Sequence, residues 1–142
     1  MLTVVAAIIV NDGKVLICQR SRTDSFPLKW EFPGGKVEAG ETPAQALERE
    51  VLEELGAPAI IGAEFHRVQH KYPEKKDPIQ LIFLWATIDA GREQNLQFEQ
   101  IVWAAPAELE SFDFLEADRE VVRRLARELD PGNPPLQQRK PQ

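Results

Sequence analysis

Apolar and polar positions in the first third of the chain predict two strands followed by a loop. Residues 3–10 (TVVAAIIV) and 14–19 (KVLICQ) are apolar runs that are joined by an Asn-Asp-Gly turn. An Asp-Gly step between two such runs is a strong signal of a β-hairpin. Prolines and glycines recur through residues 20–41, where we expect a loop.

The clearest helical pattern covers residues 42–55. Thr42 is a suitable N-cap, Pro43 fits the first helical position, and Gln45 completes a capping box. Gly56 at the other end is typical of a helix C-terminus. Leucine, valine and alanine side chains fall on one stripe of this helix, so we expect that stripe to face the core.

The rest of the chain predicts more strands and a second helix. Strands that are interrupted by one helix and closed by another indicate an α/β sandwich with a mixed central sheet. The expected elements are strands at residues 59–71, 80–89 and 98–103, a polar turn at 72–78, a helical turn at 106–112 and an amphipathic helix at 117–129.

Length and charge limit the class of protein. The 142 residues fit one domain, which we place at residues 1–130, and the proline-rich residues 131–142 predict a flexible tail. The net charge of −6 argues against a nucleic-acid polymer as partner. The longest apolar run, residues 4–10, is too short to cross a membrane, and we see no secretory signal. The lone cysteine, Cys18, fits a reducing, cytoplasmic location.

Glu50, Glu53 and Glu54 fall on an arc of the predicted helix that is separate from its apolar stripe. Taken alone, this arc is a solvated face on which Arg49 and Glu53 form an ordinary i,i+4 pair. The context changes the interpretation, because a glycine turn at residues 30–36 (WEFPGGK) precedes the helix. Carboxylates and a backbone carbonyl are the oxygen ligands that Mg²⁺ takes. Basic side chains outnumber acidic ones in the first quarter of the chain, which suits a metal-bound polyphosphate.

The spacing of these residues resembles the signature of the Nudix hydrolases. Gly35 is followed after five residues by Glu41, and after seven more by residues 49–57 (REVLEELGA). Each fixed glycine, glutamate and arginine of that signature is present, and only Ala57 departs from the bulkier aliphatic residue that is usual there. The segment WEFPGGKVEAGET is similar to the MutT-type branch of the family, and the likeness covers residues 3–129.

This resemblance implies a Nudix-type α/β/α sandwich and a hydrolase that depends on a divalent metal ion. It implies that Mg²⁺, or alternatively Mn²⁺, is held by the carboxylates of Glu50, Glu53 and Glu54 and by the carbonyl of Gly34. The metal would polarise a water molecule and neutralise the charge that develops on the phosphate oxygens. Water would convert a nucleoside triphosphate to the nucleoside monophosphate and pyrophosphate.

The resemblance also implies the catalytic side chains. Arg49 would orient the metal-binding carboxylates, and we expect it to form an ion pair with Glu41 or Glu53. Glu53 or Glu50 would deprotonate the attacking water, and the sequence does not choose between them.

A further catalytic glutamate is common in this family, a few residues before the tryptophan that corresponds to Trp103. The usual spacing falls on Gln97 in this chain, and Glu99 lies two residues closer to the tryptophan. We expect Glu99 to take the role. The alternatives are that the extra carboxylate is absent or that Glu99 is a solvated loop residue.

The nucleoside is expected near Arg20, Phe32 and Asp118, which match positions that hold it in MutT-type enzymes. Phe32 would stack on the base or pack in the core. An ionised Asp118 only accepts hydrogen bonds, which suits the N4 amine of cytosine or the N1–H and N2 amine of guanine, including 8-oxoguanine. Alternatively, Asp118 is the N-cap of the last helix. The other substrate-binding residues that we expect are Glu31, Gly35 and Lys36.

Two other functions stay open. Pro73 follows the signature at a spacing associated with ADP-ribose hydrolysis, so a hydrolase of ADP-ribose or of dinucleoside polyphosphates is an alternative. A polar turn is a sufficient reason for that proline. A Nudix domain that binds nucleotides without turnover is the second alternative, but such modules usually lack a glutamate of the signature, and none is missing here.

Overall fold

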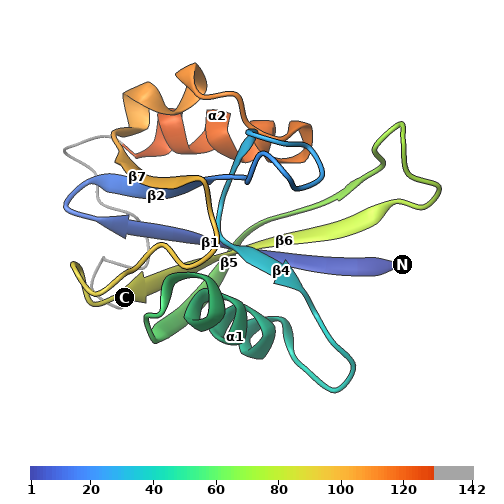
Figure 1. The fold of residues 1–142 in the computed structure, drawn as a ribbon, viewed down its shortest axis with the longest axis horizontal. Helices are drawn as coiled ribbons and strands as arrows, with labels where there is room; N and C mark the ends of the chain where they lie inside the picture. The colour runs from blue at the N-terminus through green and yellow to red at the C-terminus, as the bar shows by residue number, and fades with distance from the viewer. Residues whose placement is uncertain (130–142) are drawn as a thin grey trace.

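The computed structural model describes residues 1–129, so the tail predicted over residues 131–142 lies outside the described residues (Figure 1). Within the described part, the predicted α/β class with a mixed sheet is confirmed. The elements in chain order are β1 (Leu2–Asn11), β2 (Lys14–Gln19), β3 (Trp30–Glu31), β4 (Gly34–Lys36), α1 (Pro43–Leu55), β5 (Ala59–His70), β6 (Ile79–Ile88), β7 (Gln100–Ala104), the 3₁₀ turns η1 (Pro106–Ser111) and η2 (Glu116–Asp118), and α2 (Arg119–Glu128).

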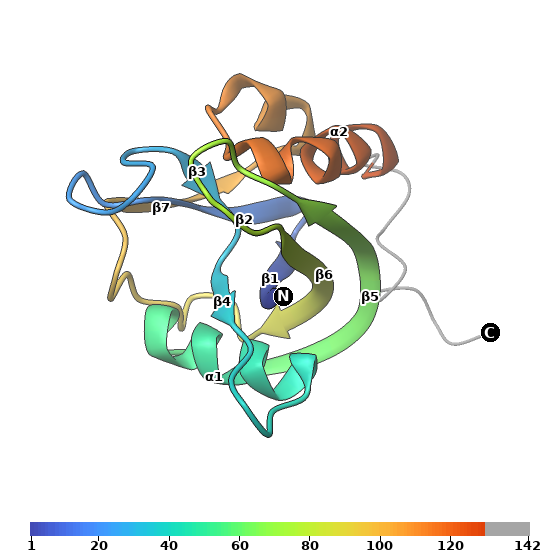
Figure 2. The same ribbon diagram turned by 90° about the vertical axis from the view of Figure 1, so that its right-hand side faces the viewer.

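Strand β1 organises the sheet. The strand order is β3-β2-β1-β6-β5, and β4 and β7 pair with β1 and β2 respectively. The β1–β6 pair is parallel, with Val5 opposite Ile82, whereas β4 is antiparallel to β1, with Val5 opposite Gly35. Helix α1 covers one side of the strands and helix α2 covers the other (Figures 1 and 2).

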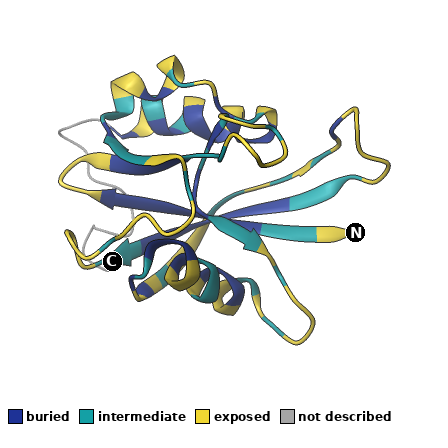
Figure 3. Cartoon of the chain, in the orientation of Figure 1, coloured by how far each residue is buried: buried dark blue, intermediate teal, exposed yellow. Residues whose placement is uncertain are grey.

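The alternation of side chains along β1 explains why the sheet can be covered on both faces. Ile8 points into a core cluster that also contains Phe83 of β6 and Leu125 of α2. Val5 points into a second cluster that contains Leu47 of α1. Buried positions accordingly follow the strands and the inner faces of both helices (Figure 3). Among residues 1–129, no helix is long and apolar enough to cross a membrane.

The loop predicted over residues 20–41 is wrong in part, because two short strands lie within it. The glycines of β4 allow its backbone to approach β1: a Cβ atom at Gly34 would overlap the carbonyl oxygen of Val5. The sequence of β4 has no alternation of apolar residues that would predict this pairing. It places the glycine turn directly between β1 and the acidic helix, and so positions the candidate site.

Candidate active site

Helix α1 presents its carboxylates to β4 because its other side is fixed in the core. Leu47, Val51 and Leu55 are fully buried against the sheet. The predicted capping box starts the helix: Thr42 Oγ1 accepts a hydrogen bond from the Gln45 amide, and the Gln45 side chain accepts one from the Thr42 amide. The glutamates are thereby held on the arc that faces the glycine turn.

Arg49 connects the carboxylates of this arc. Its guanidinium lies 2.7 Å from Glu41, 2.6 Å from Glu50 and 3.5 Å from Glu53, and it donates to the carbonyl of Lys36 at 3.1 Å. Both ion pairs named as alternatives from the sequence therefore occur, and the one with Glu41 is shorter. The hydrogen bond from Arg49 is the main reason that the pKa of Glu41 falls to about 2.

Glu54 is buried beside the glycine turn, with 4% of its surface exposed. It accepts hydrogen bonds from the Gly34 amide at 3.0 Å and from Nε2 of Gln97 at 3.2 Å. Burial, and secondarily the charge of Glu50, raise the pKa of Glu54 to about 9. A carboxylate in this position lacks a compensating cation.

The donor set of this arc fits a divalent cation. Glu50, Glu53 and Glu54 supply oxygen atoms from one helix face, and a Cβ atom at Gly35 would overlap the Glu50 carboxylate, so the glycine leaves that space open. Within residues 1–129, no three acidic, histidine or cysteine side chains converge in metal-binding geometry. The reason is visible in the contacts, since Arg49 attracts Glu50 and Glu53 while Glu54 turns to Gly34. A bound cation would have to draw these carboxylates together.

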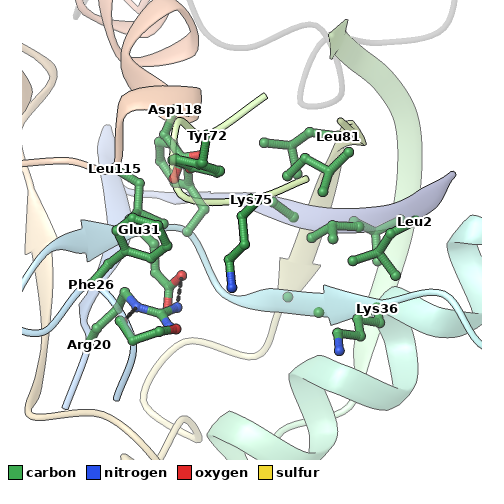
Figure 4. Close-up of a pocket in the computed structure, with 18 of the residues that line it drawn as sticks. Leu2, Arg20, Phe26, Glu31, Lys36, Tyr72, Lys75, Leu81, Leu115 and Asp118 are labelled. Carbon is green, nitrogen blue, oxygen red and sulfur yellow. Dashed lines mark hydrogen bonds and ion pairs between the residues drawn. The ribbon is translucent and has the colours of Figure 1, made fainter. Parts of the chain in front are cut away.

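A cavity of about 980 Å³ adjoins the glycine turn (Figure 4). Arg20 and Glu31 form an ion pair of 2.9 Å on its wall, and Arg20 also donates to the carbonyl of Ser25 at 2.7 Å. Burial raises the pKa of Glu31, although the charge of Arg20 opposes the shift. The predicted residues that line this cavity are Arg20, Glu31, Phe32, Gly34, Gly35, Lys36, Glu54 and Asp118.

Asp118 faces the cavity and does not act as a helix cap. It occupies the residue before α2, yet its side chain makes no capping hydrogen bond. Burial, and then the charge of Glu31, raise the pKa of Asp118 well above the usual value, opposed by a hydrogen bond with the Phe32 backbone. The Phe32 ring packs against Phe83 and Phe114 with centroid distances of 6.0 and 5.3 Å, so it belongs to the core as well as to the cavity wall.

The structure places the Glu99 side chain away from the helix glutamates. Its carboxylate lies 2.9 Å from Arg22, which lowers the pKa of Glu99, and no contact joins it to the helix glutamates within the described residues. Gln97 contacts Glu54 instead. The side chain of Asn95 folds the preceding turn by accepting from the Phe98 amide at 2.7 Å, and the Glu99 amide is bound to β2. This turn directs residue 97, and not residue 99, to α1.

The cavity also has a wall that the sequence did not identify. Tyr72 is buried and contacts the ring of Phe26, with a centroid distance of 4.8 Å, and Lys75 lines the same side. The sequence predicts a polar turn at residues 72–78 and not a wall of the cavity. The signal that was available is the aromatic residue within that turn.

Comparison with known proteins identifies relatives of this chain. Residues 1–125 match the protein family described as NUDIX domain. The 8-oxo-dGTP diphosphatase of Haemophilus influenzae is 37% identical over 131 residues, which cover 90% of this chain and 93% of that protein. The CTP pyrophosphohydrolase of Escherichia coli is 39% identical over 119 residues, which cover 83% and 86%. The solution structure of the Escherichia coli ORF135 protein has a TM-score of 0.73 at 35% identity and covers 87% of this chain and 86% of that one.

Proposed function

The chain belongs to the Nudix hydrolase family, and from that membership we propose that it hydrolyses a nucleoside triphosphate to the nucleoside monophosphate and pyrophosphate. The observation that carries the proposal is the adjacency of an acidic helix arc to a cavity that is lined by Arg20, Phe32 and Asp118. The arc suits phosphate chemistry, and the cavity is large enough for a nucleoside.

Mg²⁺ or Mn²⁺ belongs to the proposal, because Nudix hydrolases generally use divalent metal ions. Glu50, Glu53, Glu54 and the carbonyl of Gly34 would hold it. When bound, it would polarise water and offset the charge that builds up on the phosphate oxygens. The raised pKa of the buried Glu54 supports this assignment, since a cation there would compensate the carboxylate.

Glu53 is the residue that we propose as acceptor of the proton from the attacking water. Its carboxylate is 3.5 Å from Arg49 and its side chain is 57% exposed, so water can reach it. The Glu50 carboxylate is 2.6 Å from Arg49 and only 16% exposed. The short charge-assisted hydrogen bond holds the Glu50 carboxylate in one orientation, away from solvent, whereas the Glu53 carboxylate is open to water.

Asp118 is the proposed determinant of base preference. One face of its carboxyl group is satisfied by the Phe32 backbone, and the group lines the cavity. A base that offers N–H donors, such as cytosine or a guanine derivative, would satisfy it. The names of the two relatives, a CTP pyrophosphohydrolase and an 8-oxo-dGTP diphosphatase, support this pair of bases. The buried, unpaired Cys18 supports a reducing, cytoplasmic location.

The test is phosphate release from a nucleotide panel with Mg²⁺, in the presence and absence of pyrophosphatase. The panel contains the ribo- and deoxyribonucleoside triphosphates, 8-oxo-dGTP, 5-methyl-dCTP, ADP-ribose and diadenosine polyphosphates. Phosphate that appears from a triphosphate only with pyrophosphatase is the expected result, and it also identifies the base. Hydrolysis confined to ADP-ribose or the dinucleotides would contradict the proposal, and no turnover would indicate a nucleotide-binding module.

A further inference from the structure

The turn between β5 and β6, residues 71–78, is anchored over the cavity by an aromatic contact. Tyr72 is 9% exposed, and its ring lies 4.8 Å from Phe26 and 4.5 Å from His70. A turn that was only solvated would not need a buried tyrosine at its start. This contact holds the turn against the loop that carries Arg20, on the side of the glycine turn that lies away from α1 (Figure 2).

Two hydrogen bonds fix the backbone of Lys75 in this turn. Its amide donates to the carbonyl of Tyr72 at 3.0 Å, and its own carbonyl accepts from Nζ of Lys71 at 2.8 Å. From this fixed backbone the Lys75 side chain extends into the cavity, toward the region bounded by Arg20 and Lys36 (Figure 4). The hydrogen bonds of the turn therefore set the direction in which the Lys75 side chain leaves the backbone.

The Lys75 ammonium group is available to a ligand. Among residues 1–129 it takes part in no hydrogen bond or ion pair, although Glu74 and Asp77 are its neighbours in the turn. Arg20, by contrast, is already bound to Glu31 and to the carbonyl of Ser25. An uncommitted lysine that points into a cavity is suited to phosphate, because an ammonium group acts as a point charge without a fixed approach geometry.

We propose that Lys75 binds the polyphosphate chain of the substrate from the side of the turn, across from Lys36 and α1. This inference rests on the proposed function, since that chain belongs to the proposed triphosphate. The acidic arc of α1 repels a polyphosphate, and cations on the opposite side offset the repulsion. Lys75 and Lys36 would then hold the chain on both sides of the glycine turn.

The experiment compares Lys75→Gln with the wild type and with Lys14→Gln, a variant that makes the same charge change at the exposed first residue of β2. Calorimetric titration with CTP and with 8-oxo-dGTP in Ca²⁺ measures binding without requiring turnover. We expect Lys75→Gln to bind the triphosphate about tenfold more weakly, whereas Lys14→Gln changes the affinity less than about twofold. Lys75→Arg, which keeps the charge, should recover most of the loss.

Kinetics separate this inference from the proposed function. In Lys75→Gln, KM for the triphosphate should rise about tenfold while kcat stays within about twofold, because the interaction is made equally in the ground and transition states. Normal triphosphate affinity in Lys75→Gln would overturn the role of Lys75 and leave the hydrolase assignment intact. Equal losses of triphosphate affinity in Lys75→Gln and Lys14→Gln would show that the effect comes from the net charge of the protein, and this result would also overturn the role of Lys75. Failure of the wild type to bind either triphosphate would overturn both proposals.

Discussion

Gly35→Ala should slow the enzyme strongly without unfolding it. A Cβ atom at residue 35 would lie 3.0 Å from Oε1 of Glu50 and closer still to the rest of that carboxyl group, whereas ordinary contact begins at 3.4 Å. The Glu50 side chain must therefore move away from β4 by roughly 1 Å. Such a movement also strains its 2.6 Å ion pair with Arg49.

The expected loss follows from this displacement. A misplacement of about 1 Å at a reacting centre costs about 100-fold in rate, which corresponds to about 2.7 kcal/mol of transition-state stabilisation. The strand itself should tolerate the methyl group, because β4 is extended at this residue and keeps its pairing with Val5. The assay is kcat/KM for the triphosphate identified in the panel, together with thermal unfolding of each variant.

Gly62→Ala is the matched control. Its Cβ atom would make an ordinary contact of 3.5 Å with Trp85, on β5 and away from the carboxylates, so activity should be unchanged. A second test is the double-mutant cycle with Glu50→Asp, whose shorter side chain makes room for the methyl group. Glu50→Asp should cost less in Gly35→Ala than in the wild type. Full activity in Gly35→Ala would refute the argument that the space beside Glu50 matters.

Two further predictions concern buried carboxyl groups. Asp118→Asn should change the order of preference among bases. Burial also raises the pKa of Asp118 in the folded protein, so the free energy of unfolding of the wild type should fall relative to that of this variant as pH rises from about 4 toward neutrality. Urea unfolding at pH 4 and pH 7 measures this difference, and an equal difference at both values would contradict it. Glu54→Gln should abolish the rise in melting temperature that Mn²⁺ gives the wild type, as seen by thermal unfolding with Mn²⁺ and with EDTA; an undiminished rise would exclude Glu54 as a ligand.

The parts of the fold that the sequence predicts are those with local causes. The Asp-Gly turn is confirmed, with φ of 52° at Asp12 and 75° at Gly13, and so is the capping box of α1. Both depend on residues within a few positions of one another. The arc of glutamates likewise follows from helical spacing alone.

The features that the sequence does not predict depend on contacts between distant segments. Strand β4 forms because Gly34 can approach Val5, and no apolar pattern signals this pairing. The turn at Asn95 determines that Gln97, and not Glu99, contacts α1, and a count of residues does not reveal this turn. The position of Lys75 over the cavity depends on the burial of Tyr72 far along the chain from the glycine turn.

The central claim is that the glutamates of α1 carry out hydrolysis of a nucleoside triphosphate, and the most direct measurement is chromatographic analysis of the products from CTP and 8-oxo-dGTP. Wild type and Glu53→Gln, purified identically, are compared with Mg²⁺. The wild type should give equal amounts of monophosphate and pyrophosphate, and Glu53→Gln should be more than about 100-fold slower with an unchanged fold. Equal rates in the two proteins, or release of diphosphate and phosphate, would contradict the account.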